Sequence, residues 1–150
     1  MSDSCRVIRA GDPETGETGL DYFAGVLRET VGSEQLALQL VRIPPGIRSA
    51  AHSHTGHESA AYVLEGEVVT WFGDELLKHV TARKGDFVFI PEGVPHVAAN
   101  YGDTEAVALM ARSDAGAQES VKPIPRLDAL AHLENPPSKL PPPRAPRRPI

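Results

Sequence analysis

The hydrophobic residues of this chain fall in short runs in which apolar and polar positions alternate. The clearest runs are Gln35–Ile43, Leu76–Ala82 and Glu105–Arg112, and Phe87–Ile90 is a short run that is apolar throughout. Alternation with a period of two places every second side chain on one face of an extended strand. Gly, Pro and Asp separate the runs, which is typical of turns between short strands. The pattern therefore predicts an all-β sandwich or barrel with little helix.

Three other segments are less regular. The run Ala60–Gly73 is interpreted as a β-hairpin that turns near Glu65 and Gly66. Gly19–Thr30 has no decisive period and could form a strand or a single helical turn; we favour a strand because Gly25 weakens a helix. Arg6–Arg9 is a further short candidate strand.

The ends of the chain differ from its middle. We divide the sequence into N-terminal strands or an arm (residues 1–34), a barrel (35–121) and a Pro-rich basic tail (122–150). Nine of the fourteen prolines lie beyond Lys122, which favours extended polyproline II in the tail. Within it, Leu127–Leu133 has the spacing of one amphipathic turn, which is expected to pack on the barrel or on a second subunit.

Composition narrows the class of protein. A length of 150 residues suits one domain, and a single Cys5 excludes an intrachain disulfide framework. We find no apolar signal segment at the N-terminus and no run long enough to span a bilayer, so we expect a cytoplasmic protein without a membrane partner. The basic charges of the tail are sparse and lack interleaved aromatic residues, which argues against nucleic-acid binding.

The candidate chemistry lies in two short segments rich in histidine. His52 and His54 are two residues apart, so on an extended strand both imidazoles point to the same face. A third imidazole from His96 and a carboxylate from Glu58 would complete a nitrogen and oxygen ligand set. Such a set suits one divalent transition metal ion per subunit, with iron the first choice and manganese, nickel, zinc, cobalt or copper as alternatives.

These two segments resemble the two sequence motifs of the cupin superfamily. The second motif, G-x5-P-x-G-x2-H-x3-N, is matched by Gly85, Pro91, Gly93, His96 and Asn100. The first, G-x5-H-x-H followed by Glu and Gly, is matched by Gly46, His52, His54, Glu58 and Gly66. The resemblance covers roughly residues 36–112. It implies a small single-domain protein with one cupin-type double-stranded β-helix, a jelly-roll barrel that holds a mononuclear metal.

The fourth ligand depends on how the first motif is counted. Counted back from Gly66, the family's glutamate position falls at Ser59, whereas counted forward from His54 it falls at Glu58. A β-bulge would bring Glu58 onto the ligand face. We therefore predict His52, His54, Glu58 and His96 as the metal ligands, with His57 or a three-imidazole site as the alternatives.

The metal site predicts an enzyme that acts on a small molecule. Our first hypothesis is a dioxygenase-like oxygenase whose substrate is a small chelating metabolite. The alternatives are an isomerase, lyase or decarboxylase, or a non-catalytic metal- or ligand-binding protein. One-barrel cupins often dimerise, so a homodimer is expected.

The substrate pocket should have apolar walls with a few polar contacts. Candidate wall residues are Trp71, Phe87, Phe89, Ala98 and Met110. Candidate contacts to a substrate carboxylate are Arg42, Tyr62 and Arg112, which the sequence alone does not rank.

Overall fold

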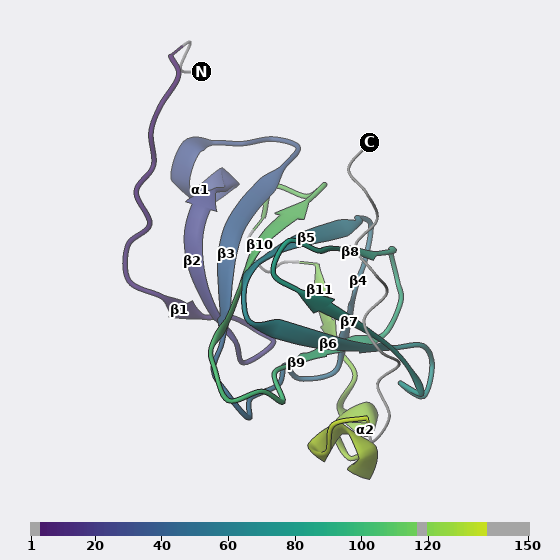
Figure 1. The fold of residues 1–150 in the computed structure, drawn as a ribbon. Coiled ribbons are helices and arrows are strands. Elements are labelled where there is room, and N and C mark those ends of the chain that lie inside the picture. The colour runs from purple at the N-terminus through teal and green to yellow at the C-terminus, as the bar shows by residue number, and fades with distance from the viewer. Residues whose placement is uncertain (1–3, 117–119, 138–150) are drawn as a thin grey trace, which may run out of the picture.

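The computed structural model describes residues 4–116 and 120–137 as a sandwich of two antiparallel sheets (Figure 1). The six-stranded sheet has the order β1 (Glu14–Thr15), β2 (Asp21–Val26), β3 (Ala37–Ile43), β10 (Ala106–Arg112), β5 (Ser59–Glu65) and β8 (Phe87–Ile90). The five-stranded sheet has the order β11 (Val121–Pro123), β4 (His52–His54), β9 (His96–Ala99), β6 (Glu67–Phe72) and β7 (Lys78–Arg83). The helical segments are short: α1 (Arg28–Val31), α2 (Pro125–Asp128) and the 3-10 turn η1 (Ala131–Glu134). The predicted all-β jelly roll is confirmed.

The alternating runs become strands close to where they were expected. In β3, the residues Ala37, Gln39, Val41 and Ile43 are buried and the intervening ones are half-buried, as a period of two requires. The segment Gly19–Thr30 contains β2 and then the four-residue helix α1. Arg6–Arg9 lies outside the strands.

The predicted hairpin at Glu65 and Gly66 is wrong. Strands β5 and β6 follow each other in the chain, yet β5 pairs with β10 and β8 while β6 pairs with β7 and β9. The chain therefore crosses from one sheet to the other at Gly66. Its φ is +74°, and a Cβ there would lie 2.6 Å from the carbonyl oxygen of Glu105. Glycine is required because the corner combines a positive φ with close approach of a second backbone segment.

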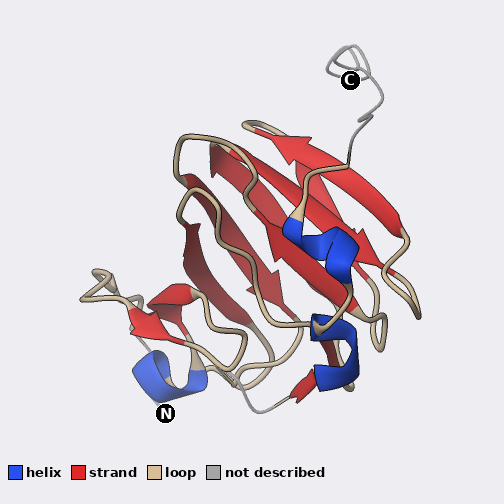
Figure 2. Cartoon of the chain, turned by 90° about the horizontal axis from the view of Figure 1, so that it is seen from below, coloured by secondary structure: helices blue, strands red, loops and turns tan. Residues whose placement is uncertain are grey.

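Two groups of buried side chains hold the sandwich together. One lies between the sheets and includes Leu20, Val41, Ile43, Ala61 and Ala108. The other lies on the opposite face of the five-stranded sheet, where α2 and η1 cover it, and Figure 2 shows these helices outside the strand layers. Leu127 and Leu133 are fully buried in this second group, so the amphipathic turn packs on the barrel.

The last part of the expected polyproline tail, residues 138–150, lies outside the described residues. Within residues 4–116 and 120–137, no helix has both the length and the apolar character needed to cross a bilayer.

Candidate metal centre

Three imidazoles from separate parts of the chain meet between the two sheets. His52 and His54 project to one side of β4, and His96 begins β9, where it is the register partner of His52. All three side chains are buried, and each offers a nitrogen that lies within 4.8 Å of the others. Ring centroids are 4.3 Å apart for His52 and His96 and 5.2 Å apart for His54 and His96. The i, i+2 spacing and the antiparallel pairing together produce this cluster.

Backbone carbonyls fix two of the rings. The Nδ1 atom of His52 lies 2.7 Å from the carbonyl oxygen of Ala50, and Nδ1 of His96 lies 2.9 Å from that of Val94. A ring that donates through Nδ1 presents Nε2 with a free lone pair, which is the usual arrangement of a metal-binding histidine. The Nδ1 atom of His54 is buried and has no hydrogen-bond partner among residues 4–116 and 120–137. These three residues therefore fit a bound transition metal.

Burial also keeps these imidazoles neutral. Loss of solvation lowers the pKa of His54 to about 2 and the pKa of His96 to about 3, with the neighbouring imidazoles acting in the same direction. Burial likewise lowers the pKa of His52. The neutral ring is the form that binds metal, so protons do not compete for these nitrogens near neutral pH.

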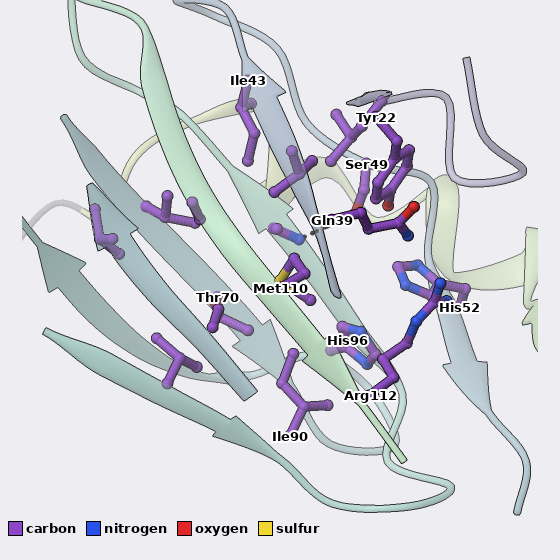
Figure 3. A pocket seen from close by; sticks show the side chains of 18 of the residues that line it. Tyr22, Gln39, Ile43, Ser49, His52, Thr70, Ile90, His96, Met110 and Arg112 are labelled. Atoms are coloured by element: carbon purple, nitrogen blue, oxygen red, sulfur yellow. Dashed lines mark hydrogen bonds between the residues drawn. The ribbon is translucent and has the colours of Figure 1, made fainter. Parts of the chain in front are cut away.

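The imidazoles line one side of a cavity of about 70 Å³ between the sheets (Figure 3). Most of the wall is aliphatic, and Met110 and Ala98 belong to it as predicted. Three other predicted wall residues lie elsewhere. Trp71 is buried under the C-terminal helices, Phe87 is exposed on the outer sheet face, and Phe89 lines an adjoining hollow that shares His96 and Ile90 with the cavity. Strand parity explains this outcome, because these aromatic side chains stand on outward positions.

The structure places the Glu58 side chain apart from the three imidazoles, so Glu58 as the fourth ligand stays a prediction. Its side chain is exposed, and its backbone N–H donates to Ser113 Oγ at 3.1 Å. Ser59 is the buried residue, and it pairs in regular register with Arg112 and Ile90. The bulge that would have turned Glu58 inward lies instead at the far end of β5, between the pairs formed by Val107 and Ala108.

His57 is buried beside the three imidazoles. Its ring centroid is 4.9 Å from that of His54, and its Nδ1 atom lies 3.7 Å from Oδ2 of Asp114. Burial lowers the pKa of His57. It adjoins the cluster without belonging to the set of mutually close nitrogens.

The three candidate contacts to a substrate carboxylate lie on opposite faces of the six-stranded sheet. Arg112 is buried and lines the cavity. Arg42 pairs with Asp21 and Glu105 on the outer face, and the Tyr62 ring packs there against the Phe87 ring. Gln39, which the sequence analysis did not single out, also lines the cavity and is buried. The available signal was its position, since Gln39 has the same parity as the buried Val41 and Ile43.

Comparison with known proteins agrees with this architecture. The family described as "Cupin domain" matches residues 39–112. The chain is 32% identical over 82 residues to auxin-binding protein ABP19b of Prunus persica, covering 52% of this chain and 39% of the relative. It is 30% identical over 105 residues to putative germin-like protein 2-3 of Oryza sativa subsp. japonica, covering 66% and 47%. The chain thus spans less than half the length of these two relatives.

Solved structures show the same fold. A predicted oxalate decarboxylase from Thermotoga maritima aligns with a TM-score of 0.61 at 23% identity, covering 73% of this chain and 99% of that one. The S161A mutant of Bacillus subtilis oxalate decarboxylase aligns with a TM-score of 0.64 at 20% identity, covering 76% and 30%. With both sequence motifs, the jelly roll and the family match in place, the chain belongs to the cupin superfamily.

Proposed function

We propose that this cupin is a metal-dependent enzyme that acts on a small chelating metabolite. The observation that carries the proposal is the convergence of three buried, neutral imidazoles, His52, His54 and His96, at the wall of a cavity between the sheets. Three protein ligands leave coordination positions for a substrate, as in catalytic rather than structural metal sites.

The chain's own residues prepare the site in three ways. Ala50 and Val94 hold two imidazoles through their carbonyl oxygens, so that the ligand nitrogens are oriented before an ion arrives. The aliphatic wall, which includes Val63, Val88 and Ile90, limits the water around a bound substrate. Arg112 adds a positive charge at the same cavity.

When bound, a redox-active ion such as iron supplies electron-transfer chemistry with O2, whereas a redox-silent ion polarises a carbonyl group. We propose iron and an oxygenase reaction first. The support is a ligand set with several open positions, which suits a substrate and O2 together.

A decarboxylase or lyase is the second candidate. The structural neighbours named oxalate decarboxylases favour it, and one of them has a title that refers to Mn(II) centres in the Bacillus subtilis enzyme. Their identity to this chain is below 25%, so the likeness concerns the fold. Manganese is accordingly the alternative metal.

Metal analysis combined with oxygen uptake tests the proposal. The purified protein should bind about one transition metal ion per chain, and His96→Ala should lose most of it while keeping the fold. His79→Ala is the matched control, because the His79 ring packs against Trp71 away from the cavity. Oxygen uptake by the iron-loaded protein with a panel of small hydroxy, thiol and enol acids favours the oxygenase. Release of CO2 without oxygen uptake would favour the decarboxylase, and full metal retention by His96→Ala would refute the site.

We also propose that the protein is a homodimer that pairs through the outer face of the six-stranded sheet. One register row crosses five strands and consists of large apolar side chains: Phe23, Leu40, Leu109, Tyr62 and Phe87. Phe87 and the nearby Phe89 are 79% and 62% exposed. A second copy can cover such a face with the same residues by two-fold symmetry.

Sedimentation analysis tests this assembly. We expect a dimer for the unmodified protein and a monomer for the double variant Phe87→Lys with Phe89→Lys. A double variant that sediments like the unmodified dimer would show that this face is not the interface.

A further inference from the structure

Gln39 presents an unsatisfied hydrogen-bond donor to the cavity. Its side chain is 4% exposed, it lines the cavity, and its Nε2 atom has no hydrogen-bond partner in the described parts of the chain. A buried amide without a partner is destabilising, so such a group calls for an acceptor that is supplied from outside the protein.

Arg112 brings a buried positive charge to the same place. It is 6% exposed, lines the cavity, and donates through Nη2 to the carbonyl oxygen of Gly116 at 3.2 Å. Figure 3 shows Arg112 and Gln39 on the side of the cavity that His52 occupies. A guanidinium presents five donors in one plane, so a hydrogen bond to a carbonyl is compatible with binding an anion through other N–H groups.

The charge balance of the cavity favours a negative ligand. None of the described residues that line it is Asp or Glu. Glu58, the one carboxylate that the sequence motif offered, faces solvent, and the buried Ser59 holds the inward position. Three neutral imidazoles would leave the charge of a bound divalent ion uncompensated. A low-dielectric cavity with this excess positive charge attracts an anion.

The rest of the cavity is apolar and small. A volume of about 70 Å³ is roughly half that of an apolar cavity that holds benzene, about 150 Å³. Beyond the polar side, aliphatic residues such as Val41, Val68 and Ala108 form the wall. A ligand with a compact polar head and a short hydrocarbon body fits a cavity that is polar on one side and aliphatic elsewhere.

We propose that Gln39 and Arg112 form a carboxylate-binding subsite, and that the site takes a small carboxylic acid with a short apolar body. The guanidinium and the amide N–H groups bind the carboxylate, and the metal side receives the reacting atoms. This proposal rests on the proposed metal-dependent function and names the class of its substrate.

The test uses full-length protein loaded with zinc, which binds the site without oxygen chemistry. Propionate and propionamide serve as probes, because they have the same size and differ in charge. Affinities are measured by NMR titration, with the side-chain amide resonance of Gln39 as a local reporter. We expect Gln39→Leu and Arg112→Met each to weaken propionate binding by about tenfold or more, since a hydrogen bond to a charged group is lost. Propionamide binding should change by less than about threefold, a difference too small to reflect such a bond.

Two variants in or just before β3, the strand of Gln39, serve as controls. Arg42→Met removes an arginine from the outer face of β3, and Gln35→Leu removes a glutamine from the exposed segment before it. Both should leave propionate binding unchanged. If Arg112→Met does not fold, Gln39→Leu decides the question.

Unchanged propionate binding by a folded Gln39→Leu variant, together with an unmoved Gln39 resonance in the unmodified protein, would overturn the subsite. Zinc stoichiometry is measured first on every sample. Failure of the unmodified protein to bind zinc would overturn the proposed function itself, whereas normal zinc binding without the propionate effects would overturn the carboxylate subsite alone.

Discussion

Acidification of the metal-free protein should destabilise it through the buried imidazoles. His54 and His96 are held neutral by burial, with pKa values lowered to about 2 and about 3, whereas both rings regain an ordinary pKa near 6.5 on unfolding. Below pH 6.5 the unfolded chain therefore binds protons that the folded chain does not. The stability that depends on these rings is complete above that pH and declines as the pH falls toward the folded values.

The size of the effect follows from these shifts. Between pH 7.5 and pH 5.5, each imidazole that protonates only in the unfolded chain lowers the free energy of unfolding by about 1.4 kcal/mol. His54 and His96 together account for about 2.7 kcal/mol. His52 and His57 have pKa values that burial also lowers, so they add a loss of the same sign.

Urea unfolding in the presence of a chelator measures this loss at the two pH values. In His96→Gln the loss should be smaller by about 1.4 kcal/mol, because one of the titrating rings is gone. His79→Gln, on the outside of the five-stranded sheet, is the matched control. Equal stability of the unmodified protein at pH 7.5 and pH 5.5 would refute the inference that these imidazoles are buried and neutral.

Three further predictions concern other parts of the structure. Glu58→Gln should leave zinc affinity within about twofold of the unmodified protein, because the Glu58 side chain is exposed. A loss of zinc affinity of about tenfold or more, the size typical of removing a group that supports a metal, would show that Glu58 belongs to the site. Gly66→Ala should lower the free energy of unfolding in urea by about 1–3 kcal/mol or more, and by more than Gly85→Ala does. Both glycines have a positive φ, but only at Gly66 would a Cβ also meet a second backbone segment. Equal effects of the two substitutions would contradict the crowding at Gly66. Asp128→Ala should weaken zinc binding by about tenfold. Asp128 Oδ1 accepts a hydrogen bond from the backbone N–H of Ala51 at 2.8 Å and so anchors the start of the strand that carries His52 and His54. Unchanged zinc affinity would show that this anchor is dispensable.

The strands and the jelly roll could be predicted because alternation is a local property. The alternating run Gln35–Ile43, for example, contains the strand β3 with the expected buried face. Alternation does not indicate which strand becomes the partner. The segment on either side of Gly66 has the same pattern in a hairpin and in a crossing between sheets, and only contact with Glu105 and Ala106 distinguishes the two.

The three imidazoles could be predicted as a group from their spacing and from the family motifs. Glu58 could not be placed, because a shift of one residue moves a side chain to the opposite face and the motif permits both counts. Arg112 was among the candidate carboxylate contacts, and Gln39 was within reach, since each is a polar residue at an inward position of a core strand. His57 follows a turn at Gly56, where φ is +78° and no period applies, so its burial depends on tertiary contacts alone.

X-ray absorption spectroscopy of the protein loaded with one equivalent of zinc tests the metal site most directly. Three imidazole nitrogens at about 2.0–2.1 Å from the ion are expected, and His96→Ala should lose one of them. A zinc environment made only of oxygen ligands, unchanged in His96→Ala, would contradict the convergence of His52, His54 and His96 on a single ion.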